Sequence, residues 1–284
     1  MTLPKITNKQ QEILRLLYRY RYLDRIQIQQ LMGHKDKRRV IAWLKDLRDK
    51  GYVEWIYSTN FIEKSKPAIY YQGLNGIRYL KTVKSDDDGT ISSLYPLEEV
   101  RKRYRDGQRS RTFIDHCLLV ADCCIELEAA NTKQPSKVRY KYLAEADYLD
   151  PDSDYYFLAE HEKLRPDLCI IKQKGQVTTN YLLEVIDATL PLYRLKFRLK
   201  AYVDYLSSYE WESEEPQPII LLVFPNLNDL IYAKRRIKKL LLDEYDETEE
   251  IPEDIHLRLC TTEKLREHGI TSDVWDEGRK SFGV

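Results

Sequence analysis

The chain has 284 residues, of which 43% are hydrophobic and 32% charged, and this length is sufficient for two domains that each bury a core. Because no apolar run approaches the ~18 residues of a membrane-spanning helix and residues 1–11 lack the apolar stretch of a signal peptide, we expect a cytoplasmic protein without membrane contact. The five cysteines are odd in number and form no CxxC pair, which argues against a disulfide framework and a structural zinc site.

The net charge of zero conceals two segments of opposite sign. Residues 1–82 carry 17 Lys and Arg against 7 Asp and Glu, a balance of +10, and residues 83–284 carry 29 against 39, a balance of −10. A basic segment of this size attracts the phosphate backbone of DNA, since each neutralised phosphate releases condensed counterions. DNA binding by the first segment is therefore the first functional prediction.

Helix-start signals divide the first fifty residues into three short helices. Thr7 with Gln10, and Asp24 with Gln27, have the spacing of a capping box, in which each side chain bonds to the other residue's backbone N–H. Apolar residues recur at helical spacing after both boxes, and a third helix begins near Asp36. The predicted helices cover about residues 8–20, 25–32 and 36–50.

The third predicted helix has an apolar side and a basic side, with the small Ala42 at the centre of the basic side. After Gly51, alternating segments over residues 52–58 and 68–72 flank a loop with two lysines, which predicts a β-hairpin. Three helices followed by a hairpin is the order of a winged helix-turn-helix, whose third helix enters the DNA major groove.

Basic residues gather on and around this third helix and in the hairpin loop. Such residues often only keep a helix surface solvated, but a cluster on the helix that reads DNA favours phosphate contact. The predicted DNA-binding residues are Lys35, Lys37, Arg38, Arg39, Lys45, Arg48, Lys64 and Lys66. A further basic run over residues 101–111 is either a second phosphate-contacting arm or a solvated helix face.

The remainder of the chain has the pattern of an α/β domain. A helix from Phe113 is followed by extended stretches over 138–149 and 167–173, the strand YLLEVI, a helix over about 191–208 and the apolar strand IILLVF. IILLVF does not alternate, as expected of a strand that helices cover on both faces. We therefore predict a winged helix over 1–82, a linker with a basic segment over 83–111 and an α/β domain over 112–284.

Two acidic residues are predicted to meet in the α/β domain. Asp167 opens one strand and Glu184 lies within the next, with a turn at Gly175 between them, so antiparallel pairing puts both carboxylates near one end of the sheet. Paired carboxylates of this kind can hold Mg²⁺ for phosphodiester hydrolysis. Alternatively, a cation on the following helix neutralises Glu184. The candidates for that cation are Arg194, Arg198 and Lys200.

The order of several segments resembles the replication-relaxation family of bacterial mobile elements over nearly the whole chain. The matching segments are NKQQEILRLLYRYRYLDRIQIQQLMG, YYQGLNGIRYL, DHCLLVAD, KLRPDLCII, YLLEVIDAT and RLKFRLKAYVDY. The resemblance implies a winged helix fused to a domain similar to the PD-(D/E)xK nuclease fold, with core order αβββαβ. It also implies that Asp167 takes the PD position and Glu184 the second acidic position, with Glu145 as a candidate third metal-binding acid.

One position departs from the nuclease pattern. Two residues after the second acid the motif has a Lys that helps to orient the attacking water, and this chain has Ile186. Asp187 points to the opposite side of the strand and cannot replace it. The following helix offers displaced cations, with Lys196 as the candidate catalytic residue beside Arg198 and Lys200.

These features favour a sequence-responsive DNA-binding regulator of replication or transcription in a plasmid, phage or integrative element, with a nuclease-like domain that need not be catalytic. Double-stranded DNA is the expected partner, and a homodimer is the usual assembly of such regulators. One alternative is a Mg²⁺- or Mn²⁺-dependent endonuclease or nickase, in which Asp167 and Glu184 hold the metal. Another is a replication adaptor whose acidic second domain binds replication proteins. Only the nuclease hypothesis calls for a cofactor.

Overall fold

The chain forms two compact units in a computed structural model that describes residues 3–58, 65–82, 103–133, 137–149, 153, 155–156, 158, 164–207, 217–244 and 256–278. The first unit contains residues 1–125 and 149–151, and the second contains residues 126–148 and 152–284. Among the described helices, none is long and apolar enough to cross a membrane. All five cysteines are buried free thiols.

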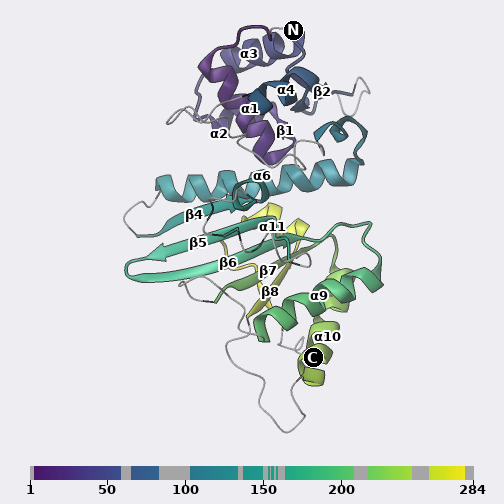
Figure 1. The fold of residues 1–284 in the computed structure, drawn as a ribbon. Helices are drawn as coiled ribbons and strands as arrows, with labels where there is room; N and C mark the ends of the chain where they lie inside the picture. The colour runs from purple at the N-terminus through teal and green to yellow at the C-terminus, as the bar shows by residue number, and fades with distance from the viewer. Residues whose placement is uncertain are drawn as a thin grey trace. The chain divides into compact units, whose positions relative to one another are not determined.

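The first unit combines the helices labelled α1 to α4 in Figure 1 with a three-stranded antiparallel sheet of order β1-β3-β2. Its elements are α1 (Asn8–Tyr20), β1 (Leu23–Asp24), α2 (Arg25–Leu31), α3 (Lys37–Asp49), β2 (Val53–Ile56), β3 (Ile69–Gln72), α4 (Leu74–Thr82), the 3₁₀ helix η1 (Asp106–Gln108) and the start of α6 (Arg111–Lys133). The three predicted helices and the predicted hairpin are confirmed. The short strand β1 was not predicted, because two residues carry no alternating pattern.

Both predicted capping boxes are formed. Gln10 Oε1 accepts a hydrogen bond from the Thr7 N–H at 2.9 Å, and Asp24 Oδ1 accepts one from the Gln27 N–H at 2.8 Å. Asp36 caps α3 by accepting from the backbone N–H two residues later at 2.9 Å. These side chains satisfy donors that the first helical turn leaves open, each worth about 1 kcal/mol, and so fix where the helices begin.

A buried carboxylate joins residues 103–109 to the helices of the first unit. The Asp106 side chain is fully buried and contacts Arg21, with Arg103 at 4.0 Å and Arg109 at 3.9 Å. Tyr22 Oη also donates to the Asp106 backbone carbonyl at 2.5 Å. Arg21 has a φ of +66°, a conformation that costs an L-residue roughly 1–2 kcal/mol. The side chain of the same residue pairs with Asp106.

The start of α6 also belongs to the first unit. Ile114 and Cys117 share a hydrophobic cluster with Tyr22 and Ile69, and Gln27 Nε2 donates to the Leu118 carbonyl at 2.9 Å. The first unit therefore includes residues 103–125, which the predicted bounds place in the linker and the α/β domain. The difference arises because these contacts join residues that are distant in the sequence and leave no local pattern.

The second unit contains a six-stranded sheet of order β4-β5-β6-β7-β8-β9. β4, β5 and β6 are antiparallel, β6, β7 and β8 are parallel, and β9 is antiparallel to β8. The elements are β4 (Arg139–Ala144), α7 (Glu145–Tyr148), β5 (Leu168–Lys174), β6 (Val177–Val185), α9 (Leu192–Ser207), β7 (Ile219–Phe224), α10 (Leu227–Glu244), β8 (Leu257–Thr261), α11 (Thr262–His268) and β9 (Asp276–Glu277).

One predicted element of this unit is wrong in part. Residues 138–149 were expected to be extended throughout, but only β4 is extended and residues 145–148 form the helical turn α7. The side chain of Asp147 accepts a hydrogen bond from the Ala144 N–H at 2.7 Å. A short acidic side chain that bonds to nearby backbone in this way competes with strand formation.

Helix α9 lies on one face of the sheet, and Leu127 of α6 and the segment after α11 lie on the other. Arg198 of α9 contacts Glu184 of β6, and α10 lies beside α9 (Figure 1). Ile170 and Tyr181 are paired across β5 and β6, and they lie three residues from Asp167 and Glu184 respectively. Because side chains alternate along a strand, Ile170 and Tyr181 face the opposite side of the sheet from the two acids.

Replacing Asp106 by Asn is expected to lower the free energy of unfolding of the first unit by about 3 kcal/mol, because buried arginines lose their carboxylate. Urea unfolding monitored by circular dichroism measures the loss. The matched control is Asp115→Asn, which removes the partner of Arg111 from an exposed pair with a 3.0 Å contact. That pair is expected to contribute under about 1 kcal/mol. Similar losses in both variants would contradict the assigned role of Asp106.

Candidate functional site

The described basic residues of the predicted DNA interface lie on and just before α3. Lys35, Lys37, Arg38, Arg39 and Lys45 are exposed, whereas Arg48 is half buried. Val40, Leu44 and Leu47 are buried on the other side of α3, which gives the two-faced helix that the sequence predicted. Arg38 and Lys45 lie opposite the buried side chains, so the packing of the apolar side keeps these two cations on the solvent-facing side of the helix.

Few acidic side chains offset the positive charge of these residues. Asp36 contacts the Arg39 guanidinium at 3.6 Å, and Asp49 contacts that of Arg48 at 3.7 Å. Both side chains of the Asp36–Arg39 pair are exposed, so water and salt screen the attraction between them and the pair is weak. Its arginine can therefore exchange Asp36 for a phosphate at small cost.

An aromatic pair lies beside the basic surface and was not predicted. The Arg48 guanidinium lies 4.2 Å from the centroid of the Trp55 ring, and Trp55 stacks on Tyr57 at 5.4 Å with an interplanar angle of 12°. Both rings are exposed, at 41% and 45%. Their spacing of two residues along the strand puts them on one face, and this alternation was the available signal. Of the predicted hairpin lysines, Lys66 is exposed and Lys64 lies outside the described residues.

The predicted pair of acids in the second unit is brought together. The pairing of Leu168 with Leu183 puts Asp167 opposite Glu184, and the Asp167 N–H donates to the Leu183 carbonyl at 2.8 Å. Asp167 Oδ2 accepts a hydrogen bond from the Val185 N–H at 2.7 Å. The two carboxylates thus lie at the end of the hairpin away from its turn, as the sequence predicted.

Glu184 is paired with an arginine. Its Oε1 lies 2.6 Å from Arg198 Nε, and Lys200, another of the predicted alternatives, pairs with Asp204 at 2.5 Å. Burial raises the pKa of Glu184, and the positive charge of Arg198 counteracts this rise. Burial, together with the negative charge of Glu184, also raises the pKa of the neighbouring Tyr202 well above its usual value. The prediction that a cation on the following helix neutralises Glu184 is confirmed for Arg198.

The other two candidate residues have different surroundings. Glu145 lies in α7. Burial is the main cause that raises the pKa of Tyr148, and the negative charges of Glu145 and Asp167 raise it further. Tyr148 Oη donates to the Pro166 carbonyl at 2.6 Å, one residue before Asp167. Lys196 is half buried on α9, two residues before the arginine that contacts Glu184. Arg198 therefore occupies the position beside the acids for which Lys196 was the candidate.

One oxygen of each carboxylate that was predicted to bind Mg²⁺ or Mn²⁺ is already engaged. Such hard cations take several oxygen ligands, but Glu184 Oε1 already contacts a guanidinium and Asp167 Oδ2 already accepts from a backbone N–H. Over the described part of the chain, no group of three or more His, Cys, Asp or Glu side chains could hold a metal ion. The positive charge of Arg198 also opposes a divalent cation at the same acids. No catalytic step through a metal follows from this arrangement.

Comparison with known proteins identifies the class to which these two units belong. The model of the replication-relaxation family matches residues 14–217, which is more than half of the chain and extends from within α1 to just before β7. The chain therefore belongs to the replication-relaxation family, as the resemblance of its segments predicted. No curated protein matches it.

Replacing Arg198 by Met is expected to lower the free energy of unfolding by about 3 kcal/mol at pH 8, since Glu184 would remain buried without its cation. The folded-state pKa of Glu184 is raised. An acid with a raised folded-state pKa destabilises the fold as the pH rises through that pKa. At low pH the Glu184 carboxyl group is protonated, so the stability lost in Arg198→Met is expected to be smaller there. Urea unfolding of wild type and variant at pH 5 and pH 8 measures the difference.

The double variant Arg198→Met with Glu184→Gln serves as the control, because it removes both charges of the pair. Because residue 184 no longer ionises, the free energy of unfolding of the double variant is expected to change less between the two pH values than that of Arg198→Met. A loss in Arg198→Met that is the same at pH 5 and pH 8 would exclude Glu184 as its cause.

Proposed function

We propose that the first unit is a winged helix that binds double-stranded DNA, and that the protein acts in this way as a regulator of mobile-element replication or transcription. The observation that carries the proposal is the group of five exposed cations on and before α3, two of which, Arg38 and Lys45, lie opposite the buried side of the helix. Membership of the replication-relaxation family supports a role in mobile-element replication.

The order of elements supports this mode of binding. α1, β1, α2, α3 and the strands β2 and β3 follow one another as in a winged helix, with α3 in the place of the helix that reads DNA. An α-helix fits a major groove about 12 Å wide. Lys35, Lys37, Arg38, Arg39 and Lys45 would contact phosphates there and set the register of the protein on the duplex.

The hairpin extends the proposed interface. Trp55 and Tyr57 form an exposed stacked pair, and the Arg48 guanidinium covers Trp55. Aromatic and guanidinium planes pack against sugars and reach phosphates at the edge of a groove. Arg48 would then act by positioning the hairpin as well as by its charge.

The second unit is proposed to be a nuclease-like scaffold without catalytic activity. The Glu184–Arg198 pair supports this reading, because it puts a cation where a divalent metal would have to bind. Such a domain is available for dimerisation or for recruiting replication proteins, and its acidic balance favours protein partners over DNA. Endonuclease activity is the competing proposal, with Asp167 and Glu184 as metal ligands.

Charge reversal at Arg38 and Lys45 tests the DNA-binding surface. The variant Arg38→Glu with Lys45→Glu is expected to weaken binding to duplex DNA of any sequence and to reduce the slope of log affinity against log salt by about two, because two phosphate contacts are lost. Fluorescence anisotropy with labelled duplex over a series of salt concentrations measures both quantities.

A matched control carries the same change of net charge elsewhere in the first unit. Lys9→Glu with Arg15→Glu reverses two exposed cations of α1. If α3 docks on DNA, the control keeps a salt slope near that of wild type. Equal effects of the two double variants would mean that only the net charge of the unit matters, and would overturn docking through α3.

Incubation with supercoiled plasmid distinguishes the two proposals for the second unit. The plasmid is expected to remain uncut by wild type and by Glu184→Ala in either Mg²⁺ or Mn²⁺, while duplex binding survives in both proteins. Nicking by wild type that is lost in Glu184→Ala, with binding unchanged, would instead identify a metal-dependent nickase. Agarose gel electrophoresis separates nicked from supercoiled DNA.

A further inference from the structure

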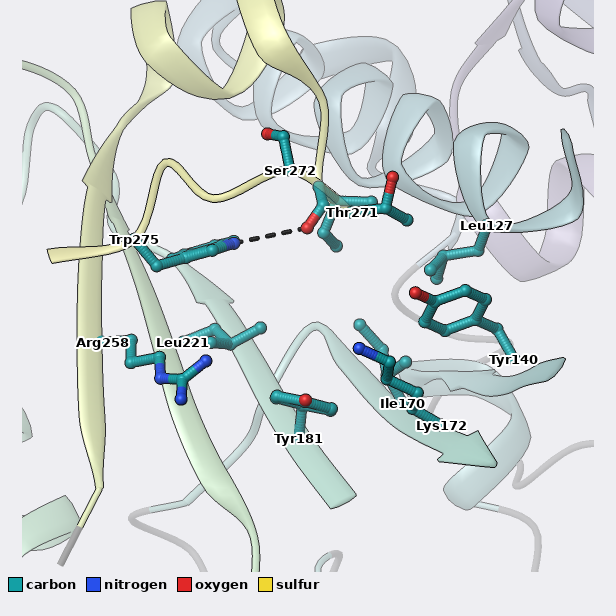
Figure 2. A pocket seen from close by; sticks show the side chains of 11 residues that line it. Leu127, Tyr140, Ile170, Lys172, Tyr181, Leu221, Arg258, Thr271, Ser272 and Trp275 are labelled. Atoms are coloured by element: carbon teal, nitrogen blue, oxygen red, sulfur yellow. Dashed lines mark hydrogen bonds between the residues drawn. The ribbon is translucent and has the colours of Figure 1, made fainter. Parts of the chain in front are cut away.

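A small pocket opens on the face of the second unit's sheet that lies opposite Glu184. Figure 2 shows Trp275 and Tyr140 on opposite sides of this pocket, with Arg258, Tyr181 and Lys172 along its floor. Its volume is about 90 Å³. Three aromatic rings and two cations therefore converge on one space, and none of the described residues that line the pocket is a carboxylate.

Strand pairing fixes the floor of the pocket. Tyr140 is paired with Lys172 across β4 and β5, and Leu221 is paired with Arg258 across β7 and β8. Residues directly opposite each other in a sheet share one face, so the register alone brings both cations to the same side. The Lys172 Nζ lies 6.0 Å from the centroid of the Tyr140 ring. Glu277 is paired with Arg258 across β8 and β9 but does not line the pocket.

Hydrogen bonds hold the wall that carries Trp275. Glu126 Oε2 accepts from the Ile270 N–H at 2.7 Å, and Trp275 Nε1 donates to the Ile270 carbonyl at 3.3 Å. Ser272 Oγ donates to the Gly269 carbonyl at 2.5 Å in the same segment. The indole is thus fixed in place before any ligand arrives, which lowers the ordering cost of binding.

The chemistry of the lining selects the ligand. Aromatic rings stack on flat ring systems, and Lys and Arg without a carboxylate among the lining residues attract an anion. The enclosed volume is well below the ~300 Å³ at which sites for drug-sized ligands begin, so it receives at most one ring of a ligand, and a phosphate attached to that ligand must lie at the mouth of the pocket. A single base with its phosphate combines these properties, whereas a base inside a duplex is already stacked and paired.

We infer that this pocket binds one nucleotide, with its base against Trp275 and its phosphate at Lys172 and Arg258. The nucleotide is either a free nucleoside monophosphate or an unpaired residue of a single strand, since both present the same base and phosphate. The site lies on the other face of the sheet from Asp167 and Glu184 and in a different unit from α3. It is therefore independent of the proposed duplex binding.

Fluorescence of the full chain tests the site. The probes are thymidine and deoxyadenosine 5′-monophosphates and a single-stranded oligothymidylate of about eight nucleotides, within the usual range of site sizes. The quenching of Trp275 is obtained by subtracting the quenching of the Trp275→Phe variant from that of wild type. This subtraction removes the contributions of the other tryptophans. Lys172→Gln with Arg258→Gln is expected to weaken binding at least about tenfold, because two charge-assisted contacts are lost.

The matched control is Lys141→Gln, which removes an exposed cation next to Tyr140 on the opposite face of β4 and is expected to bind like wild type. Quenching by monophosphates assigns the site to free nucleotides, and quenching by the oligonucleotide alone assigns it to single strands. Arg258→Gln alone repeats the test with a smaller change if the double variant unfolds at a lower temperature. No Trp275-dependent quenching by any probe, or wild-type affinity in the charge variants, would overturn the inference.

Discussion

The second unit depends on the register of a single hairpin. β5 and β6 are joined by a two-residue turn in which Gly175 has a φ of +61°, a conformation that suits glycine, and this turn fixes Leu168 opposite Leu183. A slip of one residue would move every side chain of one strand to the other face of the sheet. The same register therefore creates the acidic cluster beside α9 on one face and the floor of the proposed nucleotide pocket on the other.

The chain uses its charges in two distinct ways. Where an acid is buried, an arginine accompanies it, as Arg21 accompanies Asp106 and Arg198 accompanies Glu184. A buried charge without a partner would cost several kcal/mol, so these cations are committed to the fold and unavailable to a ligand. The cations on α3 are exposed and screened, and they remain free to exchange water for phosphate. Burial, more than the type of side chain, separates the two roles.

Local signals in the sequence predicted most of the fold. Capping side chains such as Thr7 and Asp24 act within one helical turn, and alternation along β2 and β3 acts within one strand, so these elements could be read directly. The prediction failed at α7, where the Asp147 carboxylate accepts a hydrogen bond from the Ala144 N–H and a helical turn replaces the strand. It also did not anticipate that Asp106 would hold residues 103–109 against the first unit, because that contact depends on Arg21, far away in the sequence.

The sequence by itself determined the order of most of the elements, the basic side of α3 and the meeting of Asp167 with Glu184, because each follows from spacing within an element or across one tight turn. Only the tertiary structure decided that Arg198, among several nearby cations, takes Glu184, and that Trp275 closes a pocket over Lys172 and Arg258. These outcomes depend on how helices and loops pack onto the sheet. Packing brings together side chains whose separation along the chain carries no information about their distance in space.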